Sequence, residues 1–227
     1  MVFAYSLAQV LLVPLIFAPV TYLVGKSMGK NTGWVAFIPL AYTLLLLGGI
    51  AVEIQGGGSY NETYSWAPAA GLTFGLKADG LSIWMLLTIN ILCLMISLYS
   101  IPYMEHRFHE WEHETGEHVG SGAYASYYTL YLLYAVGMLG TVMATNLIQF
   151  YLFYELMLVP SWALINNYGY GERERIGMMY FLWTHVGAVI LLAGILSSYW
   201  ITGSFEIAAL SGVVGSPIAG WIAIAIL

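Results

Sequence analysis

Glu155 is the first candidate for chemistry, because it is a lone carboxylate inside a long apolar stretch, NLIQFYLFYELMLVPSWALI. A charge at the centre of a membrane helix costs about 3 kcal/mol on insertion scales, so such residues by default mark ion or proton pathways. Pro160 lacks the N–H that would bond the carbonyl of Leu156, which frees a polar backbone group beside the carboxylate. The alternative interpretation is a structural carboxyl group that hydrogen-bonds a neighbouring helix.

His185 is the second candidate, in the apolar run FLWTHVGAVILLAGIL. At 1.5 Å per residue, Glu155 and His185 fall near the middle of two consecutive helices, a few Å apart along the membrane normal. Consecutive helices joined by a short loop are usually neighbours, so a Glu–His proton relay is geometrically possible. A histidine satisfied by Thr184 or by a backbone carbonyl is the open alternative.

Residues 109–113 read HEWEH, which matches the H-E-x-x-H pattern of zinc proteases. Glu110 would be the base, and His118 or Glu117 would be a third ligand. The stretch 105–118 is so rich in His and Glu that the pattern arises by chance, and a short polar loop offers no dry cavity for a catalytic zinc. We therefore assign no metal site and expect a solvated loop, with a membrane zinc protease as a remote alternative.

Asp79 and Ser82 lie in the sequence GLKADGLSIWML, where polar residues give way to an apolar run. Asp is a favoured residue at helix starts, so these two side chains are candidates for a helix-start motif. Anchoring at the membrane interface is the simpler role for Asp79 and Lys77.

The elements that must position these residues are transmembrane helices. Hydrophobic residues make up 60% of the chain and charged residues 8%, whereas soluble domains carry about 25% charged residues. The stretch 124–167 is too long for one crossing, so a turn is expected at Thr145–Asn146. We predict an all-α polytopic membrane protein forming a single transmembrane domain, 1–227, with about seven helices at 2–25, 33–52, 80–104, 124–144, 147–167, 176–201 and an incomplete 218–227.

The remaining segments are connections. We expect 53–79 to be a loop that packs on the helix ends, and 202–210 to be a short amphipathic helix with Ser204 as its N-cap. The positive-inside rule places the N-terminus outside, because Lys77 alone falls in outside loops. The inside loops carry Lys26, Lys30, Arg107, Arg173 and Arg175.

Composition also limits the classes of partner and cofactor that the chain can bind. The chain has no basic patch, which argues against nucleic acid, and the lipid bilayer is its first expected partner. Its single cysteine, Cys93, cannot form a disulfide within the chain. No haem-ligand pair, phosphate-binding loop or Ser/His/Asp arrangement is visible, so we expect no cofactor and no redox chemistry in this chain itself.

The motifs resemble those of a known family. FYELMLVP at 153–160 resembles the fifth-helix motif of the antiporter-like membrane subunits of respiratory complex I, with NADH-quinone oxidoreductase subunit M (subunit 4) as the nearest branch. GLKADGLSIWML, FLWTHVGAVILLAGIL and TGSFEIAAL follow that family's pattern in the same order. This resemblance covers essentially the whole chain and corresponds to the N-terminal half of a fold of roughly fourteen helices.

The resemblance implies a function. The chain would be a proton-translocating membrane-arm subunit of an NADH- or related quinone oxidoreductase, with Na⁺ as the less favoured ion. Glu155 would be the family's fifth-helix Glu, which works with a Lys in the seventh helix. Because the chain stops before such a Lys, we expect a fragment, a split gene product or an incomplete subunit.

The same resemblance implies the surroundings of the chain. Quinone, flavin and iron–sulfur clusters would reside in partner subunits, and the other membrane-arm subunits would be its neighbours in a prokaryotic plasma membrane. A component of a multisubunit cation/proton antiporter or of a membrane-bound hydrogenase remains the alternative, and so does a structural subunit that conducts nothing.

Overall fold

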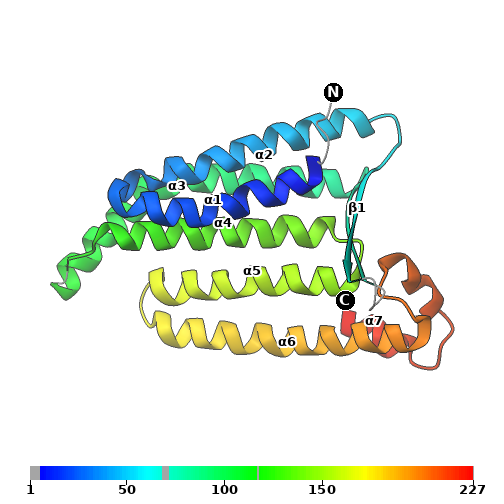
Figure 1. The fold of residues 1–227 in the computed structure, drawn as a ribbon. Coiled ribbons are helices and arrows are strands. Elements are labelled where there is room, and N and C mark those ends of the chain that lie inside the picture. The colour runs from blue at the N-terminus through cyan, green and yellow to red at the C-terminus, as the bar shows by residue number, and fades with distance from the viewer. Residues whose placement is uncertain (1–5, 68–71, 117, 227) are drawn as a thin grey trace.

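The computed structural model describes residues 6–67, 72–116 and 118–226. Long helices lie side by side in one bundle, and a two-stranded sheet crosses one end of it (Figure 1). The helices are α1 (Ser6–Met28), α2 (Thr32–Ile54), α3 (Ser82–Thr115), α4 (Ser121–Met143), α5 (Leu147–Tyr168), α6 (Arg173–Thr202) and α7 (Ala219–Ile226), with short 3₁₀ turns η1 (Gly29–Asn31) and η3 (Ile207–Val213).

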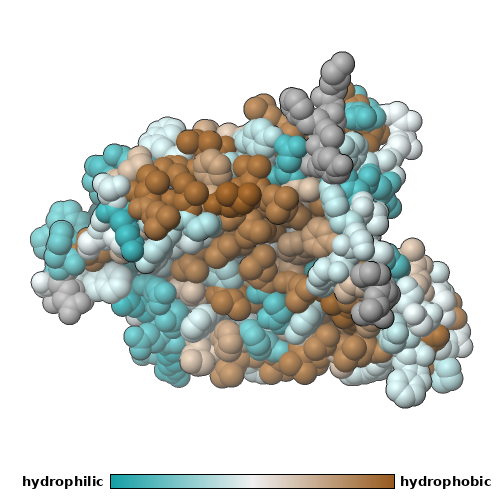
Figure 2. Space-filling view, viewed as in Figure 1, coloured by the Kyte–Doolittle hydropathy of each residue, from teal (hydrophilic) through white to brown (hydrophobic). Residues whose placement is uncertain are grey.

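The protein is a membrane protein by the length and apolar character of its helices. In the part of the chain that the structure describes, four stretches qualify as membrane spans, namely 6–54, 82–114, Leu147–Tyr168 and Arg173–Thr202. The first of these contains both α1 and α2. Figure 2 shows apolar side chains across the middle of the bundle and hydrophilic ones gathered towards its ends. This is the pattern expected of helices that cross a hydrocarbon layer.

Helix α4 is the centre of the bundle and is not among the four apolar spans. It packs against α1, α3 and α5, and buried residues follow one another along most of its length. Its Tyr, Ser and Gly residues lower its hydropathy, but a helix enclosed by other helices does not need a lipid-facing surface. Helix α5 in turn packs against α6.

The two ends of the bundle differ. At one end, the α1–α2, α3–α4 and α5–α6 connections bring together Lys26, Lys30, Arg107, Arg173 and Arg175. We call this the basic end, and the opposite one, which carries the sheet, the hairpin end.

The prediction of a loop at 53–79 that packs on the helix ends is right about the packing but wrong about the backbone, which forms a β-hairpin. The strands β1 (Tyr60–Ala67) and β2 (Leu72–Ala78) pair antiparallel, so the fold is not purely helical. Their side chains alternate between more and less exposed positions along β1, which is typical of a half-buried strand. The sheet is too small to stand alone and depends on the helix ends beneath it.

Contacts between distant segments hold the hairpin end together. Both carboxylate oxygens of Glu62 accept backbone N–H groups at the start of α1, from Leu7 at 2.8 Å and from Ala8 at 2.9 Å. Strand β2 forms a bridge with the α4–α5 turn through Leu76 and Ala144. That turn pairs in the same way with residue 206, whose side chain accepts a hydrogen bond from Thr73 at 2.6 Å.

The predicted turn at Thr145–Asn146 is confirmed. Helix α4 ends at Met143 and α5 begins at Leu147. The Asn146 side chain caps α5 by accepting the N–H groups of Ile148 and Gln149. This satisfies two donors that the first turn of a helix leaves free.

Two further predictions are wrong in detail. The stretch 105–118 is not a loop, since α3 continues through it to Thr115, more than ten residues beyond the expected end at 104. Glu and His are compatible with a helix in water, so a polar composition ended the membrane span but not the helix. Residues 202–210 do not form one amphipathic helix, because α6 runs to Thr202 and a 3₁₀ turn begins at Ile207. The Ser204 side chain accepts only the N–H of Glu206 there.

Candidate functional site

Glu155 and His185 lie opposite each other in the middle of α5 and α6. The Nε2 atom of His185 is 3.6 Å from Oε2 of Glu155. The Glu155 side chain is 24% exposed and that of His185 is 35% exposed, so both are partly enclosed. The structure therefore brings together the two residues that the sequence suggested as a relay.

Their depth follows from helix geometry. Glu155 precedes the end of α5 at Tyr168 by thirteen residues, and His185 follows the start of α6 at Arg173 by twelve. At 1.5 Å per residue both lie about 20 Å from the basic end. Because α5 and α6 run antiparallel, residues at matching distances from their shared loop meet across the interface.

Close packing fixes α5 against α4 at this level. Helix α4 presents Gly137 and Gly140 to α5, where a side chain would collide with Met157 and with the Phe153 ring. Small residues allow two membrane helices to approach closely. Met157 is two residues from Glu155, so this contact fixes the backbone of α5 at the level of Glu155.

The sequence did not single out the side chains that surround this pair. The hydroxyl group of Tyr151, one turn before Glu155 on α5, lies close enough to the Glu155 carboxylate to interact with it. The Phe181 ring lies against the His185 ring, tilted by 31° to it, with 4.0 Å between ring centres. Among the described residues, Nδ1 of His185 is buried without a hydrogen-bond partner. Tyr151 escaped notice because aromatic residues are common in membrane proteins; its spacing of one turn from Glu155 was the available signal.

Pro160 is buried in α5, five residues after Glu155. As expected, α5 continues through it as a helix, and proline cannot donate to the carbonyl of Leu156. That carbonyl is one residue from the carboxylate in the chain, which leaves a polar acceptor near the pair.

Asp79 and Ser82 lie at the hairpin end, away from this pair, at the start of α3. Oδ1 of Asp79 accepts the N–H of Ser82 at 3.0 Å, and the Ser82 hydroxyl accepts the N–H of Asp79 at 2.8 Å. The hydrogen bonds from Ser82 and an ion pair with Lys77 at 3.1 Å lower the pKa of Asp79 to about 2. The two residues thus have the geometry of a helix start and are not brought to Glu155.

The HEWEH stretch lies on the part of α3 that projects beyond the bundle at the basic end (Figure 1). The His109 and His113 rings stack with 4.8 Å between their centres, and both residues are exposed. Within the described residues no group of three or more His, Cys, Asp or Glu side chains could hold a metal ion. His118, one candidate for the third ligand that a zinc protease requires, joins no such group, and Glu117, the other, lies outside the described residues.

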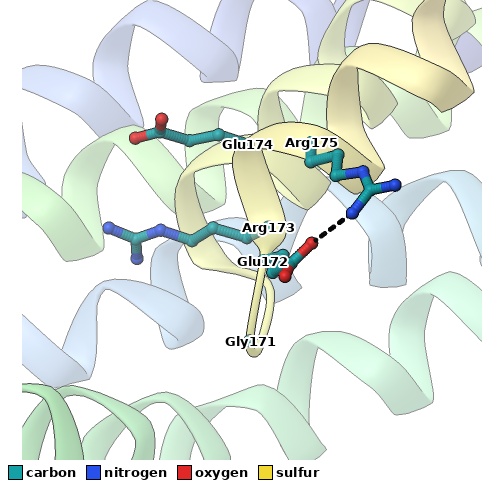
Figure 3. Close-up of a pocket in the computed structure, with 5 residues that line it drawn as sticks. All are labelled: Gly171, Glu172, Arg173, Glu174 and Arg175. Atoms are coloured by element: carbon teal, nitrogen blue, oxygen red, sulfur yellow. Dashed lines mark hydrogen bonds and ion pairs between the residues drawn. The ribbon is translucent and has the colours of Figure 1, made fainter.

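The same projection of α3 holds the loop between α5 and α6. Arg107 is buried, donates to the carbonyl of Gly169 at 2.9 Å and lies 4.1 Å from the centre of the Tyr170 ring. Arg173 lies 4.0 Å from the centre of the Trp111 ring. Figure 3 shows the start of α6, where Arg175 pairs with Glu172 at 3.0 Å while Arg173 points away from them. These charges serve the loop and are about 20 Å from Glu155.

Comparison with known proteins places this arrangement in a family. Residues 144–227 match the family described as NADH:quinone oxidoreductase/Mrp antiporter, TM, and residues 66–113 match the N-terminal part of chain 5 of NADH-ubiquinone oxidoreductase (complex I).

The curated relatives include both quinone oxidoreductase subunits and antiporter subunits. The chain is 32% identical over 179 residues to NAD(P)H-quinone oxidoreductase chain 5 of Synechocystis sp., an alignment that covers 77% of this chain and 24% of that protein. It is 29% identical over 179 residues to one of the subunits of the Na(+)/H(+) antiporter of Alkalihalophilus pseudofirmus, covering 78% of this chain and 20% of the relative. The chain thus spans about a quarter of the length of these relatives. The sequence-based assignment to the subunit M branch of the family stays a prediction.

Solved structures share the fold. The Mrp complex of a Dietzia species matches with a TM-score of 0.75 and 24% identity over 96% of this chain and 22% of that one. Respiratory complex I of Thermus thermophilus matches with a TM-score of 0.73 and 22% identity over 97% of this chain and 42% of that one. Both neighbours are chains of multisubunit membrane complexes. The helical bundle, the ordered motifs and these matches agree. The chain belongs to the antiporter-like family of membrane subunits shared by complex I-type quinone oxidoreductases and Mrp antiporters.

Proposed function

We propose that this chain is a proton-translocating membrane-arm subunit of an NADH- or related quinone oxidoreductase, and that Glu155 carries the proton. The observation that supports this most directly is the approach of His185 Nε2 to within 3.6 Å of the Glu155 carboxylate, about 20 Å from the basic end. A carboxylate and an imidazole exchange a proton once they reach hydrogen-bonding distance, which here needs an approach of about half an ångström, and each group changes its charge when they do.

In this proposal, the energy that drives proton translocation comes from other subunits. Electron transfer, with its flavin, iron–sulfur clusters and quinone, takes place in partner subunits, so this chain is enzymatic only as part of the complex. A change of charge in a neighbouring subunit shifts the field at Glu155, and the carboxylate then binds or releases a proton. The supporting fact is that solved relatives of this fold are chains of multisubunit membrane complexes.

The second candidate is a component of a multisubunit cation/proton antiporter. The similarity to the Na(+)/H(+) antiporter relative favours it, at nearly the same identity as the quinone oxidoreductase relative. The two functions differ in their driving force. Proton uptake that depends on NADH and quinone supports the first candidate, and proton release driven by an imposed Na⁺ gradient supports the second.

Substitution of Glu155 tests the role of the carboxylate. Glu155→Gln keeps the volume and most hydrogen bonds but has no titratable proton, so the assembled complex should translocate protons about a hundredfold more slowly or worse. Glu155→Asp keeps the acid and should retain part of the activity. A structural role predicts the reverse order, since Gln makes most of the same bonds and the shorter Asp misses them. Normal translocation by an assembled Gln variant would refute the proposal.

We further propose that the basic end faces the cytoplasm of a prokaryotic cell and that the N-terminus lies outside. The distribution of Lys and Arg supports this orientation. Cysteines introduced at 26–30, 105–120 and 168–175 should be protected from an impermeant thiol reagent added outside, whereas those at 53–65 should react. The reverse labelling pattern would overturn the orientation.

A further inference from the structure

A polar cavity of about 420 Å³ lies at the hairpin end. Four segments enclose it, namely the end of β2, the start of α3, the α4–α5 turn and the residues that lead into η3. A volume of this size is typical of sites that bind small molecules or parts of larger ones. The polar side chains that line it are those of Lys77, Asp79, Ser82, Thr145 and Glu206.

Two charges of opposite sign lie towards opposite ends of this cavity. Thr73 and Lys77 lie on the same face of β2, and four residues of strand separate them by about 13 Å. The Glu206 carboxylate accepts a hydrogen bond from the Thr73 hydroxyl at 2.6 Å, and the Lys77 ammonium pairs with Asp79 at 3.1 Å. Thr145 packs against the strand between these two positions. The anion of Glu206 and the cation of Lys77 are therefore both held in place on the cavity wall.

Both charged groups have hydrogen-bonding capacity left for a ligand. An ammonium group has three donors and a carboxylate about four acceptor sites, and the contacts with Asp79 and Thr73 use one of each. The Lys77 side chain is 47% exposed, so a ligand can reach it. Lys77, Asp79 and Glu206 together carry one negative charge, which disfavours a ligand that is only negative. A ligand with one negative and one positive group matches the two ends of the cavity.

The cavity lies at the level where lipid headgroups are found. Ser82 begins α3, whose apolar stretch qualifies as a membrane span. Its neighbours Leu81, Trp84 and Met85 are exposed apolar side chains. Tryptophan is enriched at the membrane interface, and exposed apolar side chains beside it face acyl chains. A phospholipid beside Ser82 can therefore place its headgroup in the cavity and its acyl chains along α3.

We propose that this cavity binds the headgroup of phosphatidylethanolamine from the leaflet at the hairpin end. Lys77 donates to the phosphate, and the Glu206 carboxylate accepts N–H groups from the headgroup amine. Phosphatidylcholine has the same charges, but its nitrogen carries three methyl groups and cannot donate to Glu206. Phosphatidylglycerol has the phosphate without a cation and would add a negative charge to a negative cavity. This site does not depend on Glu155 or on proton translocation.

The experiment places the assembled complex in phosphatidylcholine vesicles with a trace of phosphatidylethanolamine that carries a photoreactive group near the top of one acyl chain. After illumination, mass spectrometry of peptides locates the label, which is expressed per amount of this subunit. Residues 81–89 should be labelled about fivefold more than by the same trace of photoreactive phosphatidylcholine or phosphatidylglycerol, because hydrogen bonds between charged groups are the strong ones.

Two variants and a matched control test the assignment of the two charges. Glu206→Gln keeps an oxygen for the Thr73 hydroxyl but loses the charge, so labelling by phosphatidylethanolamine should fall to the level of phosphatidylcholine. Lys77→Gln removes the cation and should lower labelling by phosphatidylethanolamine about fivefold. Lys30→Gln is the control, because Lys30 is also half-exposed and ion-paired, at 2.7 Å to Glu105, but lies at the basic end. It should leave the labelling of residues 81–89 unchanged.

The contrary outcomes are distinct. Equal labelling by the three lipids in the parent protein would refute the site, and so would a preference for phosphatidylethanolamine that survives Glu206→Gln. Equal losses in Lys77→Gln and Lys30→Gln would show a general response to a lost cation. Glycerophosphoethanolamine, which has the headgroup but no acyl chains, should displace little label, and full displacement would show a site for a soluble ligand instead of a lipid. None of these results depends on whether Glu155→Gln translocates protons.

Discussion

Replacing Gly137 by Ala should destabilise the protein, although alanine is the better helix former. A Cβ atom at Gly137 would lie 2.6 Å from the backbone nitrogen and 2.8 Å from the Cα atom of Met157. Non-bonded carbon atoms settle at about 3.5–4.0 Å, so α4 and α5 must separate locally by about 1 Å. Overpacking of this kind costs about 1–3 kcal/mol, and the helix propensity of alanine returns about 1 kcal/mol. The expected net loss is up to about 2 kcal/mol.

Gly48 on α2 provides the control with the opposite sign. A Cβ atom there would meet no atom within 4 Å, so Gly48→Ala gains helix propensity without a collision. At about 2–4 °C per kcal/mol for a chain of this size, Gly137→Ala should lower the apparent Tm by up to about 8 °C and Gly48→Ala should raise it slightly. Thermal unfolding of the purified protein in detergent measures both. If the two variants shift the Tm in the same upward direction, the close approach of α4 and α5 is not what the structure indicates.

Three further predictions concern the ends of the bundle. Glu62→Gln removes one of two carboxylate acceptors at the start of α1 and should cost about 1 kcal/mol, seen as a lower Tm in detergent. The lowered pKa of Asp79, about 2 against an ordinary 3.8, means that its ionised form stabilises the fold fully above pH 4 and loses this effect as the pH falls through 2. The parent protein should therefore be more stable than Asp79→Ala at pH 5, and the difference should shrink towards pH 2. Replacing His109 and His113 together by Ala should leave proton translocation by the assembled complex unchanged, and the variant should bind as much zinc as the parent. A loss of both translocation and bound zinc would revive a metal-binding role for this stretch.

The helical framework could be predicted because apolar runs separated by Lys and Arg report directly on membrane crossings. The meeting of Glu155 with His185 could also be predicted, since depth along two antiparallel helices needs only residue counts. The hydrogen bond between Ser161 and Tyr180 on the same interface could not, because such contacts depend on how each helix is rotated about its axis. A rotation of one residue, about 100°, would turn either side chain away from the interface, and sequence periodicity does not fix it so finely.

Two elements were mistaken for loops for different reasons. The end of α3 is helical because its side chains hold other parts of the chain, with Arg107 bonded to Gly169, and such long-range contacts leave no local pattern. The hairpin was missed because its strands are short and contain polar residues such as Asn61 and Lys77, which alternate with half-buried ones. Both cases show tertiary contacts deciding the structure of segments whose composition suggested only exposure to water.

The connections at the hairpin end impose an order on biosynthesis. Helix α1 leaves the ribosome before the hairpin, yet the carboxylate that accepts its first N–H groups belongs to Glu62, which is made some fifty residues later. The hairpin can form its bridge to Ala144 only after α4 has been made, and Thr73 can donate its hydrogen bond only after Glu206 has been made. Helices can insert one after another as they are made, but this end of the bundle can close only when residue 206 has emerged. A nascent chain held on the ribosome before that point should keep its strands accessible to proteases, although most of its helices are already in the membrane.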